Sequence, residues 1–96
     1  MINIFAPFLG NKPVPLEING HRLLILSIDK NAIEDELDVL GADKVKRLRD
    51  IFTTADQERV FSSLAKSIDG GVVLAPENIK IEDLIRSLES ELPWIQ

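Results

Sequence analysis

The apolar and polar positions of the chain predict strands in its first third. Apolar residues alternate with other residues over 14–18, a period of two that is typical of a strand with one solvent-facing side. Residues 21–28 are apolar almost continuously from position 23, which predicts a central strand covered on both faces. Asn19 and Gly20 stand between these segments and favour a type I′ turn, in which both central residues take positive φ. A β-hairpin is therefore expected over 14–28.

Two shorter segments are further strand candidates. Residues 2–5 are a candidate for a further short strand, and Pro13 and Pro15 suit an edge position, where no hydrogen-bond donor is missed. Residues 72–74 are apolar and stand between a glycine pair and Pro76. This pattern predicts a short buried strand that joins the hairpin.

The remaining segments follow a helical period and predict three to four helices. The first begins at a cap on Asp29 or Asn31 and ends at Gly41, which suits a left-handed C-terminal position. The second begins near Asp43. Its apolar side is formed by Val45, Leu48, Ile51 and Phe52.

The third helix has the clearest helical period in the chain. Thr54 and Gln57 form a capping-box pattern at its start, and Gly70-Gly71 ends it. Its apolar stripe consists of Val60, Phe61, Leu64, Ala65 and Ile68. The last helix carries Ile81, Leu84, Ile85, Leu88 and Leu92, and it stops before Pro93, which has no N–H to donate.

Together these elements predict a single α+β domain over residues 1–96. We expect the N-terminal β-hairpin sheet to be joined by the short strand near 72–74, with three to four helices packed on one face. A chain of 96 residues is long enough for one hydrophobic core, and no internal repeat or linker divides it.

Composition narrows the function classes. Sixteen acidic and eleven basic residues give a net charge of −5, which opposes approach to nucleic acids and to anionic membrane surfaces. The lack of cysteine excludes disulfides, thiolate nucleophiles and sulfur-rich zinc sites, and it fits a cytoplasmic protein. The longest apolar run, 23–26, is far shorter than the roughly 20 residues that cross a bilayer, so membrane insertion is not expected.

The sequence predicts no catalytic residue, cofactor or metal. His21 is the only histidine, and no further transition-metal ligands are placed around it. The serines do not lie in a nucleophile-elbow pattern, and Gly70-Gly71 lacks the lysine and hydroxyl of a phosphate loop. A small enzyme whose site is completed across a dimer interface, around His21, Asp29 and nearby carboxylates, stays an alternative.

Two charged clusters suit solvent-facing surfaces. The acidic cluster consists of Glu34, Asp35, Glu36 and Asp38. Carboxylates early in a helix favour the positive end of its dipole, and the other interpretation is a docking face for a basic partner. The basic cluster consists of Lys44, Lys46, Arg47 and Arg49, on the predicted solvent face of the second helix.

One segment shows a local similarity. It consists of Gly70-Gly71-Val72-Val73-Leu74-Ala75-Pro76, followed by Ile79, Ile81, Asp83-Leu84-Ile85 and Leu88-Glu89. This segment resembles part of the winged-helix repressors that sense iron–sulfur or redox state, in which a double-glycine wing leads through a strand to a helix. The family's cluster-binding cysteines are missing here, and a strand-rich segment replaces its N-terminal helix. The resemblance implies, as an alternative, a DNA-binding transcriptional regulator with Gly70-Gly71 at the wing tip.

Both ends of the chain are apolar, and they contain the predicted partner-binding residues. These residues are Phe5, Phe8, Leu92, Trp94 and Ile95. Such residues either fold back on the core or present an apolar surface to a partner, and tryptophan is enriched at interface hot spots. The function we expect is a non-enzymatic protein-interaction or accessory module that binds a protein partner or self-associates as a dimer.

Overall fold

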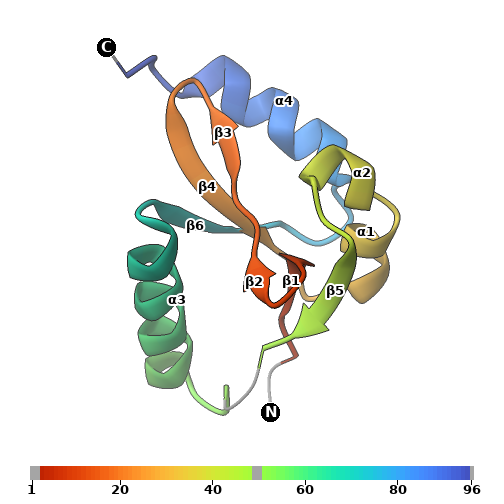
Figure 1. The fold of residues 1–96 in the computed structure, drawn as a ribbon, viewed down its shortest axis with the longest axis vertical. Coiled ribbons are helices and arrows are strands. Elements are labelled where there is room, and N and C mark those ends of the chain that lie inside the picture. Colours follow the sequence, from red (N-terminus) through yellow and green to blue (C-terminus); the bar gives the residue numbers. More distant parts are fainter. Residues whose placement is uncertain (1–2, 49–50, 96) are drawn as a thin grey trace.

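The computed structural model describes residues 3–48 and 51–95, and these residues form two three-stranded sheets and four α-helices (Figure 1). The predicted α+β class is confirmed. Part of the strand expected over 2–5 lies outside the described residues, and the strand that forms in this region is β1 (Phe5–Leu9).

The predicted hairpin and the short strand after the glycine pair form one sheet. Its strands are β3 (Leu16–Ile18), β4 (His21–Leu26) and β6 (Gly71–Leu74), in the order β3-β4-β6. β3 is antiparallel to β4, and β6 is parallel to it. Asn19 and Gly20 have φ values of 52° and 83°, so both central residues have the positive φ that a type I′ turn requires. The hairpin and its third strand are both confirmed.

The second sheet contains β1, β2 (Lys12–Pro13) and β5 (Lys44–Arg47), in the order β2-β1-β5, and its strands are antiparallel. Phe5 links the two sheets because it pairs with Ser27, just beyond the end of β4. The N–H of each residue donates to the carbonyl oxygen of the other, at 2.7 and 3.0 Å. β1 thus lies beside the chain that leaves β4.

The second predicted helix is wrong, because Lys44–Arg47 form the edge strand β5. Half-buried Val45 stands between exposed Lys44 and Lys46, a pattern that an edge strand shares with an amphipathic helix. Pairing with β1 decides the outcome, since the ladder joins all four residues of β5 to β1 and satisfies their inward backbone groups. Arg49, also assigned to this helix, lies outside the described residues.

The first predicted helix is present but is divided into α1 (Lys30–Glu34) and α2 (Leu37–Leu40). The Asp29 carboxylate caps α1 by accepting a hydrogen bond from the N–H of Asn31 at 3.0 Å. Gly41 ends α2 with a φ of 68°. Both end signals were predicted from the sequence, because each depends only on neighbouring residues.

The cap of α3 (Thr54–Ile68) lies one residue earlier than predicted. The Thr53 hydroxyl accepts a hydrogen bond from the N–H of Asp56 at 3.1 Å, and the Asp56 carboxylate accepts one from the N–H of Thr53, also at 3.1 Å. The Asp56 carboxylate accepts a further bond from the N–H of Phe52, at 3.2 Å. The Thr53–Asp56 box forms in place of the predicted Thr54–Gln57 box, because a carboxylate that accepts two backbone donors is the stronger cap.

Gly70 allows the chain to enter β6. A Cβ atom on this residue would lie only 2.2 Å from the carbonyl oxygen of Arg22, its neighbour on β4. The N–H of Gly70 donates to the carbonyl oxygen of Ala65 at 3.0 Å and closes the end of α3. Glycine is needed here because two backbones approach each other closely.

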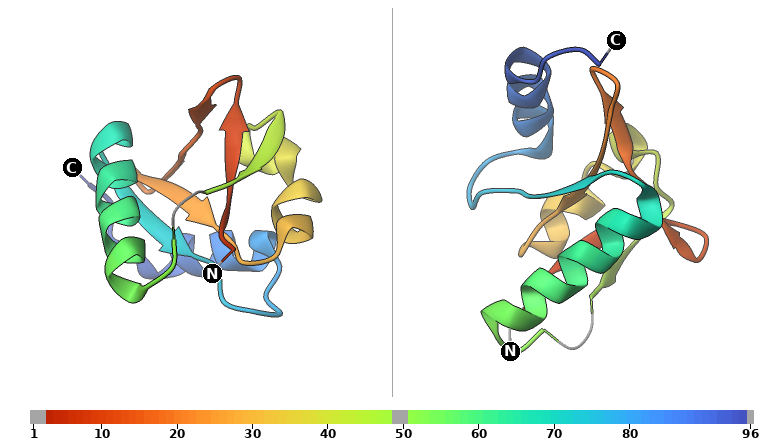
Figure 2. Two further views of the ribbon diagram at one scale, coloured as in Figure 1. Left: turned by 90° about the horizontal axis from the view of Figure 1, so that it is seen from below. Right: turned by 90° about the vertical axis from the view of Figure 1, so that its left-hand side faces the viewer.

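The helices cover both faces of the β3-β4-β6 sheet, not one face as predicted (Figure 2). Side chains alternate between the two faces along a strand. Leu24 and Leu26 pack in the core cluster that includes Ile68 of α3, whereas Ile25 packs in the cluster covered by α4 (Ile81–Glu91). All three β4 residues are buried, so each face needs its own helix.

Candidate functional site

The C-terminal segment, residues 92–95, lies against the tip of the β3–β4 hairpin (Figure 1). Asn19 is its main anchor. The Asn19 side-chain amide donates to the carbonyl oxygens of Glu89 and Leu92, both at 2.8 Å. The N–H of Ile95 donates in return to the carbonyl oxygen of Asn19, at 3.1 Å. The turn residue therefore holds the segment at both ends.

His21 and Gly20 complete this attachment. Nε2 of His21 lies 2.7 Å from the carbonyl oxygen of Pro93. A carbonyl oxygen can only accept, so the ring nitrogen is the donor. A Cβ atom on Gly20 would lie 3.1 Å from Cβ of Ile95, so the missing side chain lets the segment lie close to the turn.

The attachment leaves the apolar side chains of the segment in solvent. Trp94 is 74% exposed and Ile95 is 58% exposed, whereas Leu92 is half-buried. Backbone and amide hydrogen bonds, and not burial of the side chains, therefore hold the segment in place. Of the two interpretations of the apolar C-terminus, an exposed surface is the one that the structure shows.

The structure does not bring the five predicted partner-binding residues together. Phe5 and Phe8 lie on β1, where Phe5 packs against one core cluster and Phe8 against the other. The Lys46 ammonium lies 4.9 Å from the centre of the Phe8 ring, a cation–π contact that covers part of it. The C-terminal segment, which contains Trp94 and Ile95, lies at the hairpin tip, away from β1 (Figure 1). The two phenylalanines are half-buried against the core, and the C-terminal residues form a separate surface.

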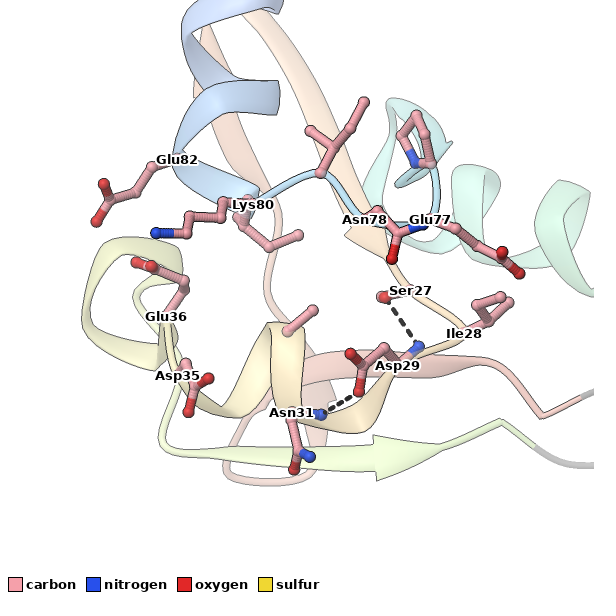
Figure 3. Close-up of a pocket in the computed structure, with 14 residues that line it drawn as sticks. Ser27, Ile28, Asp29, Asn31, Asp35, Glu36, Glu77, Asn78, Lys80 and Glu82 are labelled. Atoms are coloured by element: carbon pink, nitrogen blue, oxygen red, sulfur yellow. Dashed lines mark hydrogen bonds between the residues drawn. The ribbon is translucent and has the colours of Figure 1, made fainter.

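A second candidate site is an open cleft of about 710 Å³ beyond the carboxyl ends of β4 and β6. The chain that leaves β6, residues 76–80, forms one wall, and α1 with the acidic residues after it forms the other (Figure 3). Clefts at the carboxyl ends of parallel strands are common ligand positions in α/β proteins. The charged residues that line it are Asp29, Asp35, Glu36, Glu77, Glu82 and Lys80.

Negative charge dominates this cleft. Desolvation raises the pKa of Glu36, and the carboxylates of Glu82 and Asp35 raise it further, whereas the Lys80 ammonium lowers it. The Lys80 side chain points toward Glu36 and Glu82 (Figure 3). Ser27, which is only 4% exposed, uses its hydroxyl to accept a hydrogen bond from the N–H of Asp29 at 3.0 Å. The buried polar group of the floor is therefore satisfied within the chain.

The geometry also bears on the two alternative functions. Gly70 and Gly71 join a helix to a strand that is parallel to its neighbour, so they do not form the tip of a hairpin, and the predicted wing is wrong. His21 begins β4 and Asp29 follows its end, which separates them by about 20–25 Å at the rise of an extended strand. One chain therefore does not unite these two residues in a single site.

Sequence reasoning missed the residues that build these sites from distant segments. Asn19 was predicted only as a turn residue, yet its side chain binds a carbonyl group 73 positions away. The loop 76–80 was not assigned to a site, although it forms a wall of the cleft. No local pattern marks either contact, because each depends on how β6 and α4 return to the hairpin.

No model of a known protein family matches the chain, and neither a curated protein nor a solved structure matches it. Within residues 3–48 and 51–95, no three side chains of histidine, cysteine, aspartate or glutamate are placed to hold a metal ion. No helix in the same residues is long and apolar enough to cross a membrane. The function is therefore inferred from the surfaces of the chain itself.

Proposed function

We propose that this protein is a non-enzymatic protein-interaction module that self-associates through its C-terminal segment, residues 92–95. The observation that carries this proposal is Trp94, which is 74% exposed on a segment held by hydrogen bonds to the hairpin. Tryptophan is a favoured anchor of protein interfaces, because it buries a large apolar area with little loss of side-chain entropy.

The fixed position of the segment supports an interaction role. Ordering a mobile tail on binding would cost free energy for each residue that is immobilised. Here Asn19 and His21 already hold the backbone, so a partner meets a preorganised apolar surface. The association therefore keeps more of the free energy gained when Trp94 and Ile95 leave water.

A second copy is the partner that we propose. In a two-fold dimer the same patch serves both subunits, so each exposed side chain contributes twice to the buried area. Among the described residues 92–95, the large apolar side chains that are exposed are Trp94 and Ile95. A contact of this size is at the small end of specific interfaces. We therefore expect a weak dimer, with a Kd on the order of 1–100 μM.

Sedimentation analysis of the wild type and of two matched variants tests the proposal. Trp94→Ala should shift the protein to monomer across the micromolar range without changing its far-ultraviolet circular dichroism. Phe52→Ala is the control, because Phe52 is also a large exposed aromatic residue (62%) but lies before α3, away from the hairpin tip. A wild type that sediments as a monomer at every concentration would overturn the proposal. So would a Trp94→Ala variant that dimerises as strongly as the wild type.

A further inference from the structure

β6 leaves one side of its backbone without a neighbouring strand. It is an edge of the β3-β4-β6 sheet. The N–H of Ala75 donates to the carbonyl oxygen of Leu26, and Leu74 is in register with the same residue. Backbone groups alternate sides along a strand, so Val72 and Leu74 direct their N–H and C=O groups away from β4. In the described chain, no other segment forms backbone hydrogen bonds with these groups.

The other edge strands of the described residues carry the features that discourage strand addition. β2 consists of Lys12 and Pro13, β3 contains Glu17, and β5 is mostly basic. By contrast, β6 consists of a glycine and three apolar residues, and all four are half-buried, whereas the central residues of β4 are fully buried. β6 is the unprotected edge of the described structure.

The surroundings of this edge suit one added strand. β6 runs between α3 and α4, which lie on opposite faces of its sheet (Figure 2). The edge is limited at one end by Gly70, whose N–H already bonds to Ala65, and at the other by Pro76, which has no N–H. Between these limits, Val72 and Leu74 offer two donors and two acceptors to an extended segment.

Charge identifies the kind of segment that fits. A second copy pairing antiparallel through its own β6, with the two-fold axis at Val73, would bring the acidic residues that flank β6, Asp69 of one copy and Glu77 of the other, to the same end of the pair. Like charges brought near each other at both ends of the pair repel, which opposes this pairing. Beyond β6 the cleft adds further carboxylates, with Lys80 as the one cation among the described residues that line it. The edge therefore favours a basic segment over a second β6.

We propose that the free edge of β6 binds an extended, basic segment of another protein as an added strand. Apolar or β-branched side chains of that segment would lie beside Val72 and Leu74, and its lysine or arginine side chains would reach the carboxylates of the cleft and Glu77. This site is distinct from the self-association proposed for residues 92–95. Its occupancy does not depend on Trp94, because the segment 92–95 lies at the hairpin tip (Figure 1).

Binding of a labelled synthetic peptide tests this proposal. The probe has alternating valine and threonine residues in its centre and lysines at both ends, and its affinity is measured by fluorescence anisotropy. One matched peptide carries glutamates in place of the lysines, and another carries N-methyl groups on its central amides. We expect binding of the lysine peptide alone, with slower hydrogen exchange at the amides of Val72 and Leu74.

Charge variants of the protein locate the contact. Glu77→Lys should weaken the lysine peptide about two- to fivefold, the value expected when one exposed ion pair is lost. Glu91→Lys, the same change at the far end of α4, should leave the affinity unchanged, as should Trp94→Ala. Equal binding of the N-methylated peptide, or unchanged exchange at Val72 and Leu74, would overturn the proposal. Protection of these two amides without peptide, in a dimer, would show that a second copy occupies the edge and would overturn it as well.

Discussion

Replacing Gly70 with alanine should destabilise the protein strongly, although the residue is exposed and lies outside any strand or helix. The new Cβ atom would lie 2.2 Å from the carbonyl oxygen of Arg22 and 3.0 Å from that residue's Cβ. The atom in the way belongs to the backbone of β4, so it cannot turn aside as a flexible side chain would. The start of β6 must therefore move away from β4.

The cost of this movement follows from what it disturbs. The chain must shift by about 0.8 Å to restore a contact of 3.0 Å. Overpacking of this kind costs typically 1–3 kcal/mol, and about 1 kcal/mol more is lost for each backbone hydrogen bond that the shift weakens. We expect a loss of about 2–4 kcal/mol in the free energy of unfolding. For a domain of this size, that corresponds to a melting temperature lowered by roughly 10–20 °C.

Gly71→Ala is the matched control. Its Cβ atom would meet only Cδ2 of Leu23, at 3.1 Å, and the end of a leucine side chain can move. The free energy of unfolding should change by less than about 1 kcal/mol, since alanine also reduces the entropy of the unfolded chain. Urea unfolding followed by circular dichroism measures both variants. If Gly70→Ala and Gly71→Ala differ by less than about 0.5 kcal/mol, the close approach of the two backbones does not limit this position, and the reasoning is refuted.

Three further predictions concern the turn, the cap and the acidic cleft. Gly20→Val should lower the free energy of unfolding by more than about 1 kcal/mol, because a β-branched residue resists positive φ. Urea unfolding measures this loss, and an unchanged free energy of unfolding would show that the turn tolerates side chains. By the same assay, Thr53→Ala should lower the free energy of unfolding by about 1 kcal/mol, and Thr54→Ala should lower it much less, because Thr53 provides the cap. Equal losses for the two variants would contradict this assignment. The raised pKa of Glu36 means that its ionised form is disfavoured in the folded state, so stability falls as pH rises from the ordinary value of 4.5 through the raised pKa. Glu36→Gln should therefore stabilise the protein at about pH 7 and not at about pH 3, and stabilisation of equal size at both pH values would exclude this cause.

Local signals predicted the parts of the fold that depend on a few neighbouring residues. Asn19-Gly20 indicated a turn with two positive φ values, Asp29 indicated a cap, and Gly41 indicated a helix end. The apolar run of β4 also predicted a central strand covered on both faces. These predictions succeed because backbone preference and side-chain period act over one turn or one strand.

Where two local solutions were nearly equivalent, hydrogen bonds outside the sequence pattern decided between them. Val45 between two lysines fits a helix or an edge strand, and the neighbouring strand β1 selects the strand. Thr53 and Thr54 both have a polar residue three positions later, and the second bond of Asp56, to the N–H of Phe52, selects Thr53. In each case the sequence pattern was ambiguous by itself, since the deciding hydrogen bond lies outside the pattern.

By itself, the sequence determined the class of the fold, the hairpin, the cap at Asp29, the helix end at Gly41 and the apolar nature of both termini. Only the tertiary structure decided that Phe5 and Phe8 pack against the core while Trp94 stays exposed, because β1 lies in the β2-β1-β5 sheet and the C-terminal segment lies at the tip of the hairpin in the other sheet. It also decided the free edge of β6 and the acidic cleft beyond it. These sites join segments that are tens of residues apart, and their positions follow from the pairing of β6 with β4, which no local preference encodes.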